Sequence, residues 1–213
     1  MWNISQQAKD DFLIKVMLPI PESSEEWEEL LEEDDDALNS LRDELKEGKP
    51  LLKQTLPERF HPYLEEGSLV EPSLPDSVRE DYLSFQRDAE NEFNEVLQAA
   101  EEQTEKALPF LSEKARDVFS DSLHDAVIEE VNYETDALHM VLNMESGFSE
   151  KNTITLSFLG IQSQQAAQPL QVGQWLLYHE LQKTEDGFAF RGLFDCPEVE
   201  WTVTIKGLEA SYT

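Results

Sequence analysis

The chain has 213 residues, with 46 Asp and Glu against 16 Lys and Arg, and its formal net charge is -30. Because nucleic-acid phosphates and anionic membrane surfaces attract basic proteins, this charge argues against nucleic acid and against membranes as partners. The length suffices for one large domain or two small ones, and eleven Phe, five Tyr and four Trp indicate that the chain folds.

The cysteine content and the N-terminal sequence bear on the cellular compartment. A single cysteine, Cys196, can form no intramolecular disulfide, and the N-terminus lacks the basic and then apolar stretch of a secretory signal peptide. The apolar runs are far shorter than the roughly 20 residues that span a bilayer. We therefore expect a cytoplasmic protein.

Helical periodicity begins near the N-terminus. Apolar residues recur every four positions and predict a short amphipathic helix from Ser5 to Met17. Ser23 or Ser24 is a suitable cap for a second helix, whose first turn is rich in carboxylates. A leucine repeat continues the helical period to Gly48, which we expect to end it before Pro50.

The middle of the chain is broken and then strongly helical. Residues 51–75 contain several prolines and a glycine among apolar residues, which predicts an irregular but packed connector. Residues 76–107 carry apolar side chains at steps of three and four and predict a long helix. Pro109 breaks this pattern, and Ser112 is placed to cap a last, short helix.

After Leu123 the hydrophobic period changes from 3.6 to 2, which indicates strands. Short connections at 133–136, 185–187 and 195–198 leave no room for parallel crossovers, so we expect an antiparallel meander of about six strands. The Gln-rich stretch from Gln162 to Gln171 is interpreted as a loop between the third and fourth strands.

These patterns predict an α+β fold in which N-terminal helices pack on a C-terminal antiparallel β-sheet. We expect residues 1–123 to form the helical part and residues 124–213 the β part. The two parts can also form one integrated domain.

Several separated motifs occur in a characteristic order. They are Glu25-Glu26-Trp27, Phe60-His61-Pro62-Tyr63 followed by Gly67, Leu123-His124-Asp125, and Trp175-Leu176-Leu177-Tyr178-His179-Glu180. This order, which covers most of the chain, resembles an uncharacterised family of acidic cytoplasmic proteins of Gram-positive bacteria, known only as a domain of unknown function. The resemblance implies no activity, substrate or catalytic residue.

One segment concentrates the negative charge, because residues 22–36 hold ten carboxylates and no base. One interpretation is a solvated helix start that favours solubility. The other is an acidic face for a basic protein, formed by Glu25, Glu28, Glu29, Glu32 and Asp35. Charge complementarity would act on partner choice and association rate. Our leading hypothesis is therefore a non-enzymatic interaction protein, of the immunity or inhibitor type, that binds a basic protein.

The histidines are the strongest candidates for chemistry. They are His61, His124 beside Asp125, His139, and His179 beside Glu180. Each can equally be a packed or hydrogen-bonded structural residue. A zinc site would require about three of these side chains to converge, and neighbouring residues on a strand point to opposite faces. We therefore expect no metal site.

The alternative hypothesis is a small-ligand binder, or an enzyme of unrecognised type, with a pocket between the helices and the sheet. Its candidate ligand-binding residues are His61, His124, Asp125 and Tyr178. Gly-rich nucleotide loops, nucleophile elbows and zinc signatures are absent from the sequence, and the acids around Cys196 disfavour a thiolate. We therefore assign no catalytic residue and expect no cofactor.

Overall fold

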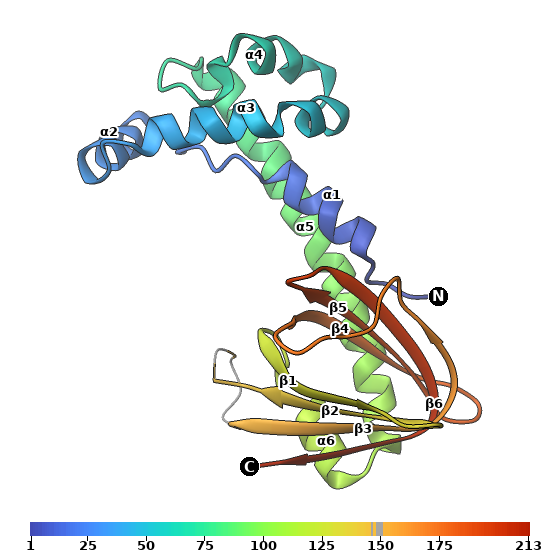
Figure 1. The fold of residues 1–213 in the computed structure, drawn as a ribbon. Helices are drawn as coiled ribbons and strands as arrows, with labels where there is room; N and C mark the ends of the chain where they lie inside the picture. The colour runs from blue at the N-terminus through green and yellow to red at the C-terminus, as the bar shows by residue number, and fades with distance from the viewer. Residues whose placement is uncertain (146, 148–150) are drawn as a thin grey trace. The chain divides into compact units, whose positions relative to one another are not determined.

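The computed structural model describes residues 1–145, 147 and 151–213. Within these residues the chain forms six α-helices, mostly N-terminal, and six strands in a C-terminal antiparallel sheet (Figure 1). The predicted α+β class is confirmed. The chain divides into two compact units: Gln7–Glu95, here the helical unit, and Met1–Gln6 with Val96–Thr213, here the barrel unit. The change of period near Leu123 therefore lies inside the barrel unit.

The helical unit contains helices that the sequence predicts, at residues 6–15, 24–33 and 37–55, and one at 61–66 that it does not. Ser23 caps the second helix, because its Oγ accepts a hydrogen bond from the Glu26 N–H at 3.1 Å. Among the described residues, no helix combines the length and the apolar character that a membrane crossing requires. The α-helices of the whole chain are α1 (Gln6–Lys15), α2 (Ser24–Glu33), α3 (Ala37–Thr55), α4 (His61–Glu66), α5 (Asp76–Ala107) and α6 (Glu113–Phe119).

Two expectations about the helical unit are wrong. Helix α3 does not end at Gly48 but continues through Pro50 to Thr55. Its buried face runs on to Leu52, so burial outweighs the one backbone hydrogen bond that proline removes. The segment after it is also more regular than an irregular connector, since α4 and two 3-10 turns, Glu58–Phe60 and Ser68–Val70, occupy most of it.

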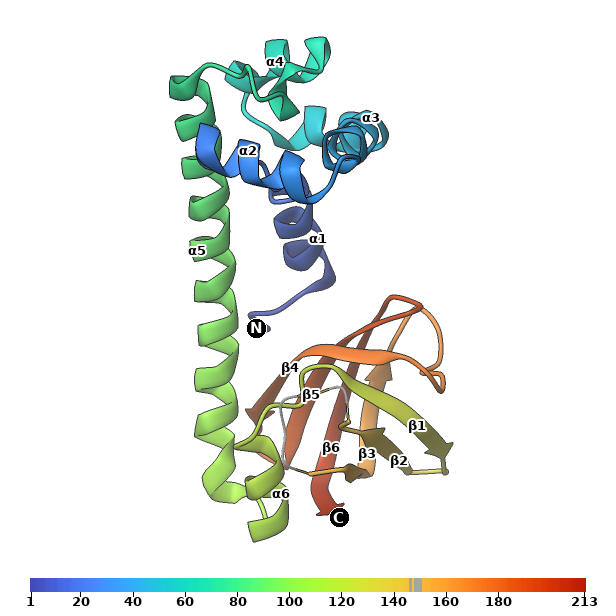
Figure 2. The same cartoon turned by 90° about the vertical axis from the view of Figure 1, so that its left-hand side faces the viewer.

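The six strands of the barrel unit form one closed antiparallel sheet in the order β1-β2-β3-β6-β5-β4 (Figure 2). A simple meander is wrong, because β3 pairs with β6 rather than with β4. The strands are β1 (Ala126–Tyr133), β2 (Ala137–Asn143), β3 (Thr153–Gln165), β4 (Trp175–Lys183), β5 (Phe188–Asp195) and β6 (Val199–Tyr212).

The Gln-rich stretch is only partly a loop. Its first residues continue β3, where Gln164 pairs with Val203 and Gln165 with Thr202 of β6. Strand β6 is 14 residues long and supplies backbone partners along this extension. The remaining residues connect β3 to β4.

Aromatic rings fill the interior of the barrel. The ring centroid of Phe158 lies 5.2 Å from that of Phe190 and 5.1 Å from that of Trp201, both in edge-to-face geometry. Residues of α6, including Val118 and Phe119, belong to the same core. Ser112 begins this helix as expected, because its Oγ accepts from the Ala115 N–H.

The N-terminal segment Met1–Gln6 is fastened to the barrel by a buried carboxylate. Glu180 Oε2 accepts hydrogen bonds from the N–H of Asn3 at 2.8 Å and of Ile4 at 3.2 Å. The Arg191 guanidinium donates to the Ile4 carbonyl at 2.9 Å. Glu180 is 0% exposed, so these bonds supply partners that a buried charge requires.

Candidate functional site

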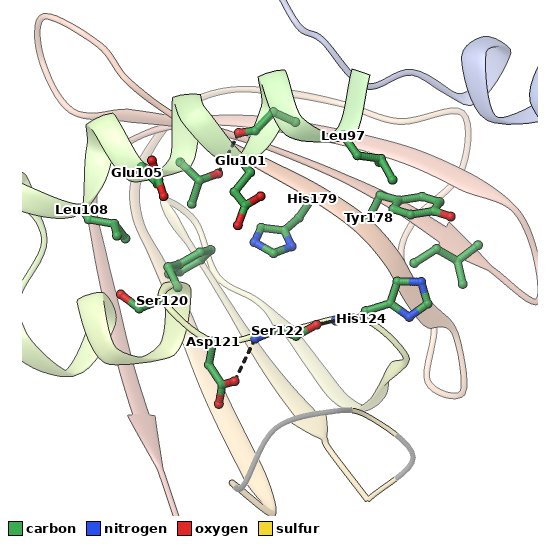
Figure 3. A pocket seen from close by; sticks show the side chains of 14 residues that line it. Leu97, Glu101, Glu105, Leu108, Ser120, Asp121, Ser122, His124, Tyr178 and His179 are labelled. Atoms are coloured by element: carbon green, nitrogen blue, oxygen red, sulfur yellow. Dashed lines mark hydrogen bonds between the residues drawn. The ribbon is translucent and has the colours of Figure 1, made fainter. Parts of the chain in front are cut away.

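A pocket of about 500 Å³ lies in the barrel unit, between the C-terminal part of α5, the connection from α6 to β1, and β4 (Figure 3). All of its 14 lining residues belong to this unit. Its volume is within the roughly 300 to 1,000 Å³ of pockets that enclose small organic ligands.

The pocket lies beside the weakest seam of the barrel. Strands β1 and β4 pair only through Ala126 with Leu176 and Val127 with Trp175. Farther along β4 its edge meets α5 instead, because the Leu181 N–H donates to Thr104 Oγ1 at 3.1 Å. The neighbour of β4 thus changes from strand β1 to helix α5 along its length, and the pocket lies where this change occurs.

A bulge in β4 directs three consecutive residues to the pocket. The register with β5 shifts between Leu176 and Tyr178, and Leu177, Tyr178 and His179 all line the cavity. In a regular strand, adjacent side chains point to opposite faces, whereas a bulge re-aims them.

His179 presents a neutral imidazole to the pocket. Its ring is half-buried, with the ring centroids of Phe119 and Phe190 at 5.6 and 6.0 Å. Burial, together with the nearby His124, lowers the pKa of His179 to about 4. Figure 3 shows the ring inside the pocket with the Glu101 carboxylate directed toward it. At neutral pH one ring nitrogen can donate and the other can accept a hydrogen bond.

His124 and Tyr178 form a second group at the pocket. Their rings meet edge to face, with 5.4 Å between centroids. His124 Nδ1 lies 3.0 Å from Asp125 Oδ1, within ion-pair distance when the ring is protonated. Asp125 has a φ of 64°, and its N–H donates to the Leu176 carbonyl at 3.0 Å, which ties the residue to β4. The His124 ring also lines the pocket, where it can form a hydrogen bond with a ligand.

The charged groups of the pocket are acidic. Glu101 and Glu105 are exposed on α5, one helical turn apart, and Asp121 follows α6. Asp121 is partly neutralised, since its Oδ2 accepts from Lys151 Nζ at 3.1 Å. No lysine or arginine is among the 14 lining residues.

The ligand-binding residues that the sequence suggests do not all belong to this pocket. His124 and Tyr178 line it, and Asp125 lies beside His124 without lining the cavity. His61 belongs to the helical unit, where its Nε2 lies 2.9 Å from the Leu56 carbonyl oxygen, and it is not a lining residue.

The acidic face suggested for a basic partner is exposed. Trp27 is buried on the opposite side of α2. Within the described ranges, none of the five carboxylates takes part in an ion pair, and all are exposed: Glu25, Glu28, Glu29, Glu32 and Asp35.

Sequence reasoning missed several residues of the pocket. Glu101, Thr104 and Glu105 share one face of a predicted helix, which is the only signal that could have grouped them. With 46 acids in the chain, nothing in the sequence distinguishes these two. Across residues 1–145, 147 and 151–213, no three His, Cys, Asp or Glu side chains are grouped to hold a metal ion, and Cys196 is free and exposed.

A family and a solved structure that resemble this chain are both uncharacterised. The profile of a family described as "Protein of unknown function (DUF4085)" matches residues 6–205. No curated protein matches the chain. A crystal structure of an uncharacterized protein from Neisseria gonorrhoeae is 10% identical, with 41% of this chain and 91% of that chain covered and a TM-score of 0.31.

Proposed function

We propose that this chain, which belongs to the DUF4085 family of proteins of unknown function, binds a small organic molecule in the pocket of its barrel unit. The observation that carries the proposal is the His179 ring, which is directed into a cavity of about 500 Å³. In the described part of the chain no hydrogen bond to this ring is found, although it stacks on Phe190 and meets Phe119 in edge-to-face geometry. Because the ring is half-buried, its nitrogens are accessible from the cavity, and a ligand there is a suitable hydrogen-bond partner.

The rest of the lining suits a binding site. Leu97, Leu108 and Phe119 supply apolar surface, while Thr104, Tyr178 and His124 supply a few polar groups. Pockets for small molecules combine an apolar lining with a small number of placed polar groups. The pocket is also built from segments fixed by the barrel core, which limits the entropy lost on binding.

Filling the pocket should abolish binding. Ser120 is exposed at the end of α6 and lines the pocket, so the Ser120→Trp side chain can occupy it without disturbing the core. With 2-phenylethanol as a neutral probe, we expect a saturation-transfer NMR signal from the wild type and at least a tenfold weaker signal from the variant. The control Ser84→Trp places the same ring on an exposed position of α5 in the helical unit and should retain the signal.

Two outcomes would count against a ligand pocket in the barrel unit. One is equal signal from the wild type and Ser120→Trp, which would place the probe elsewhere. The other is the absence of signal from the wild type at millimolar concentrations of the probe.

A basic protein partner at the acidic face of α2 is a second candidate function. Five exposed carboxylates without ion pairs in the described ranges favour it, and a cytoplasmic location is part of this candidate. We expect a basic protein to co-purify at low salt and to dissociate at about 0.5 M salt, because exposed charges are screened. Neutralising all five carboxylates should abolish co-purification of the basic protein. Neutralising five exposed acids of α3 and α5 instead should leave co-purification intact. Equal loss of the basic protein from both variants would contradict a specific binding face.

A further inference from the structure

The charged groups at the pocket determine which ligand charge it favours. Glu101 and Glu105 add two carboxylates one turn apart, and in the described ranges no ion pair neutralises either of them. Asp121 adds a third, which Lys151 offsets. Because no lysine or arginine lines the cavity and the whole chain carries a charge of -30, the local potential is negative.

The rings at the pocket are compatible with a cation. Phe119 and Tyr178 offer aromatic surface, and ring faces attract ammonium groups. His179 adds no positive charge at neutral pH, because burial lowers its pKa to about 4. An anionic ligand would instead meet Glu101 and Glu105 with no positive lining group to pair with.

We propose that the pocket binds a small organic ammonium ion, with its apolar body against Leu97, Leu108 and Phe119 and its ammonium group toward Glu101 and Glu105. This inference rests on the proposed function, since it names the ligand class of the same site. The cavity of about 500 Å³ limits the ligand to the size of a small amine and excludes a folded partner.

Three probes with the same apolar body and different charge test the inference. They are 2-phenylethylamine, 2-phenylethanol and 3-phenylpropanoate, with dissociation constants measured by NMR titration at pH 7.5 and low salt. We expect the amine to bind at least tenfold more tightly than the carboxylate, with the alcohol between them. The advantage of the amine should shrink as salt is added.

A matched pair of variants locates the charge. Glu101→Gln should weaken binding of the amine roughly fivefold and leave the alcohol unchanged, because it removes one ionic partner of the ammonium group. Glu102 lies next to it on α5 but does not line the pocket, so Glu102→Gln should change neither affinity.

The outcomes separate the ligand class from the site itself. Equal or tighter binding of the alcohol or the carboxylate would overturn the ammonium inference and leave the pocket as a binding site. An equal effect of Glu101→Gln and Glu102→Gln would also overturn it. Binding of none of the three probes would overturn both the inference and the proposed function.

Discussion

Replacing His179 with phenylalanine should remove part of the acid sensitivity of the folded state. The pKa of His179 is lowered to about 4 in the folded chain, chiefly by burial and also by His124, while an unfolded histidine titrates near 6.5. Between these values the unfolded chain binds a proton that the folded chain does not. The contribution of the neutral His179 to the free energy of unfolding is therefore fully present above about pH 6.5. It is lost as the pH decreases toward 4.

The expected size of this effect is about 2 kcal/mol. The difference between the folded and unfolded pKa of His179 corresponds to a loss of about 3 kcal/mol in the free energy of unfolding. The partial accessibility of the ring from the pocket makes the expected loss smaller. The groups that face the ring are His124 and Glu101 at the pocket and the rings of Phe119 and Phe190. Phenylalanine keeps the ring contacts and cannot be protonated, so the comparison isolates the imidazole.

The measurement is urea unfolding of wild type and His179→Phe at pH 7.5 and pH 4.5. The wild type should lose about 2 kcal/mol more than the variant between the two pH values. Tyr178→Phe is the control, because it alters the same pocket and leaves His179 in place, and it should behave like the wild type. Parallel pH profiles for wild type and His179→Phe would contradict a buried neutral imidazole.

Glu180→Ala should destabilise the barrel unit by about 3 kcal/mol. The carboxylate is fully buried and accepts hydrogen bonds from Asn3 and Ile4, so its loss leaves the buried Ile4 N–H and the half-buried Asn3 N–H without this acceptor. Ile4 packs with Ala100 and Leu193, and the half-buried Leu97 and Tyr178 pack against this cluster. Leu97 and Tyr178 also line the pocket, so the variant should weaken probe binding as well as stability.

Urea unfolding measures the loss of stability, and amide hydrogen exchange at Ile4 measures how far the N-terminal segment is released. Exchange of the Ile4 amide should accelerate in Glu180→Ala, because its acceptor is removed. The control Glu185→Ala removes an exposed carboxylate in a turn, and its effect on stability should stay within about 0.5 kcal/mol. A Glu180→Ala variant as stable as this control would show that the carboxylate does not hold the N-terminal segment.

The helices and strands can be predicted from the sequence, but the closure of the sheet into a barrel cannot. Serine caps at Ser23 and Ser112 and the change of period near Leu123 predict where helices begin and strands take over. The sheet closes through only two residue pairs between β1 and β4, and β3 pairs with β6 across the chain. Such long-range pairing has no local signal, which is why a meander is expected. Continuation of α3 through Pro50 likewise depends on tertiary burial.

The site is less predictable than the fold, because it depends on which side chains meet. His124 and Tyr178 stand out in the sequence and do meet, with their rings in contact at the pocket. His179 is compatible with a core histidine from its pattern, and only the bulge in β4 and the neighbouring helices place it in a cavity. His61 is equally prominent in the sequence but bonds to backbone in the helical unit.

Binding of a small organic molecule in the pocket of the barrel unit can be tested residue by residue. Amide chemical-shift mapping of the full chain during titration with 2-phenylethylamine tests it most directly. We expect the largest shifts at Thr104, Ser122, Tyr178 and His179, which line the pocket, and their loss in Ser120→Trp. Shifts confined to the acidic face of α2, or spread evenly over exposed carboxylates, would contradict it.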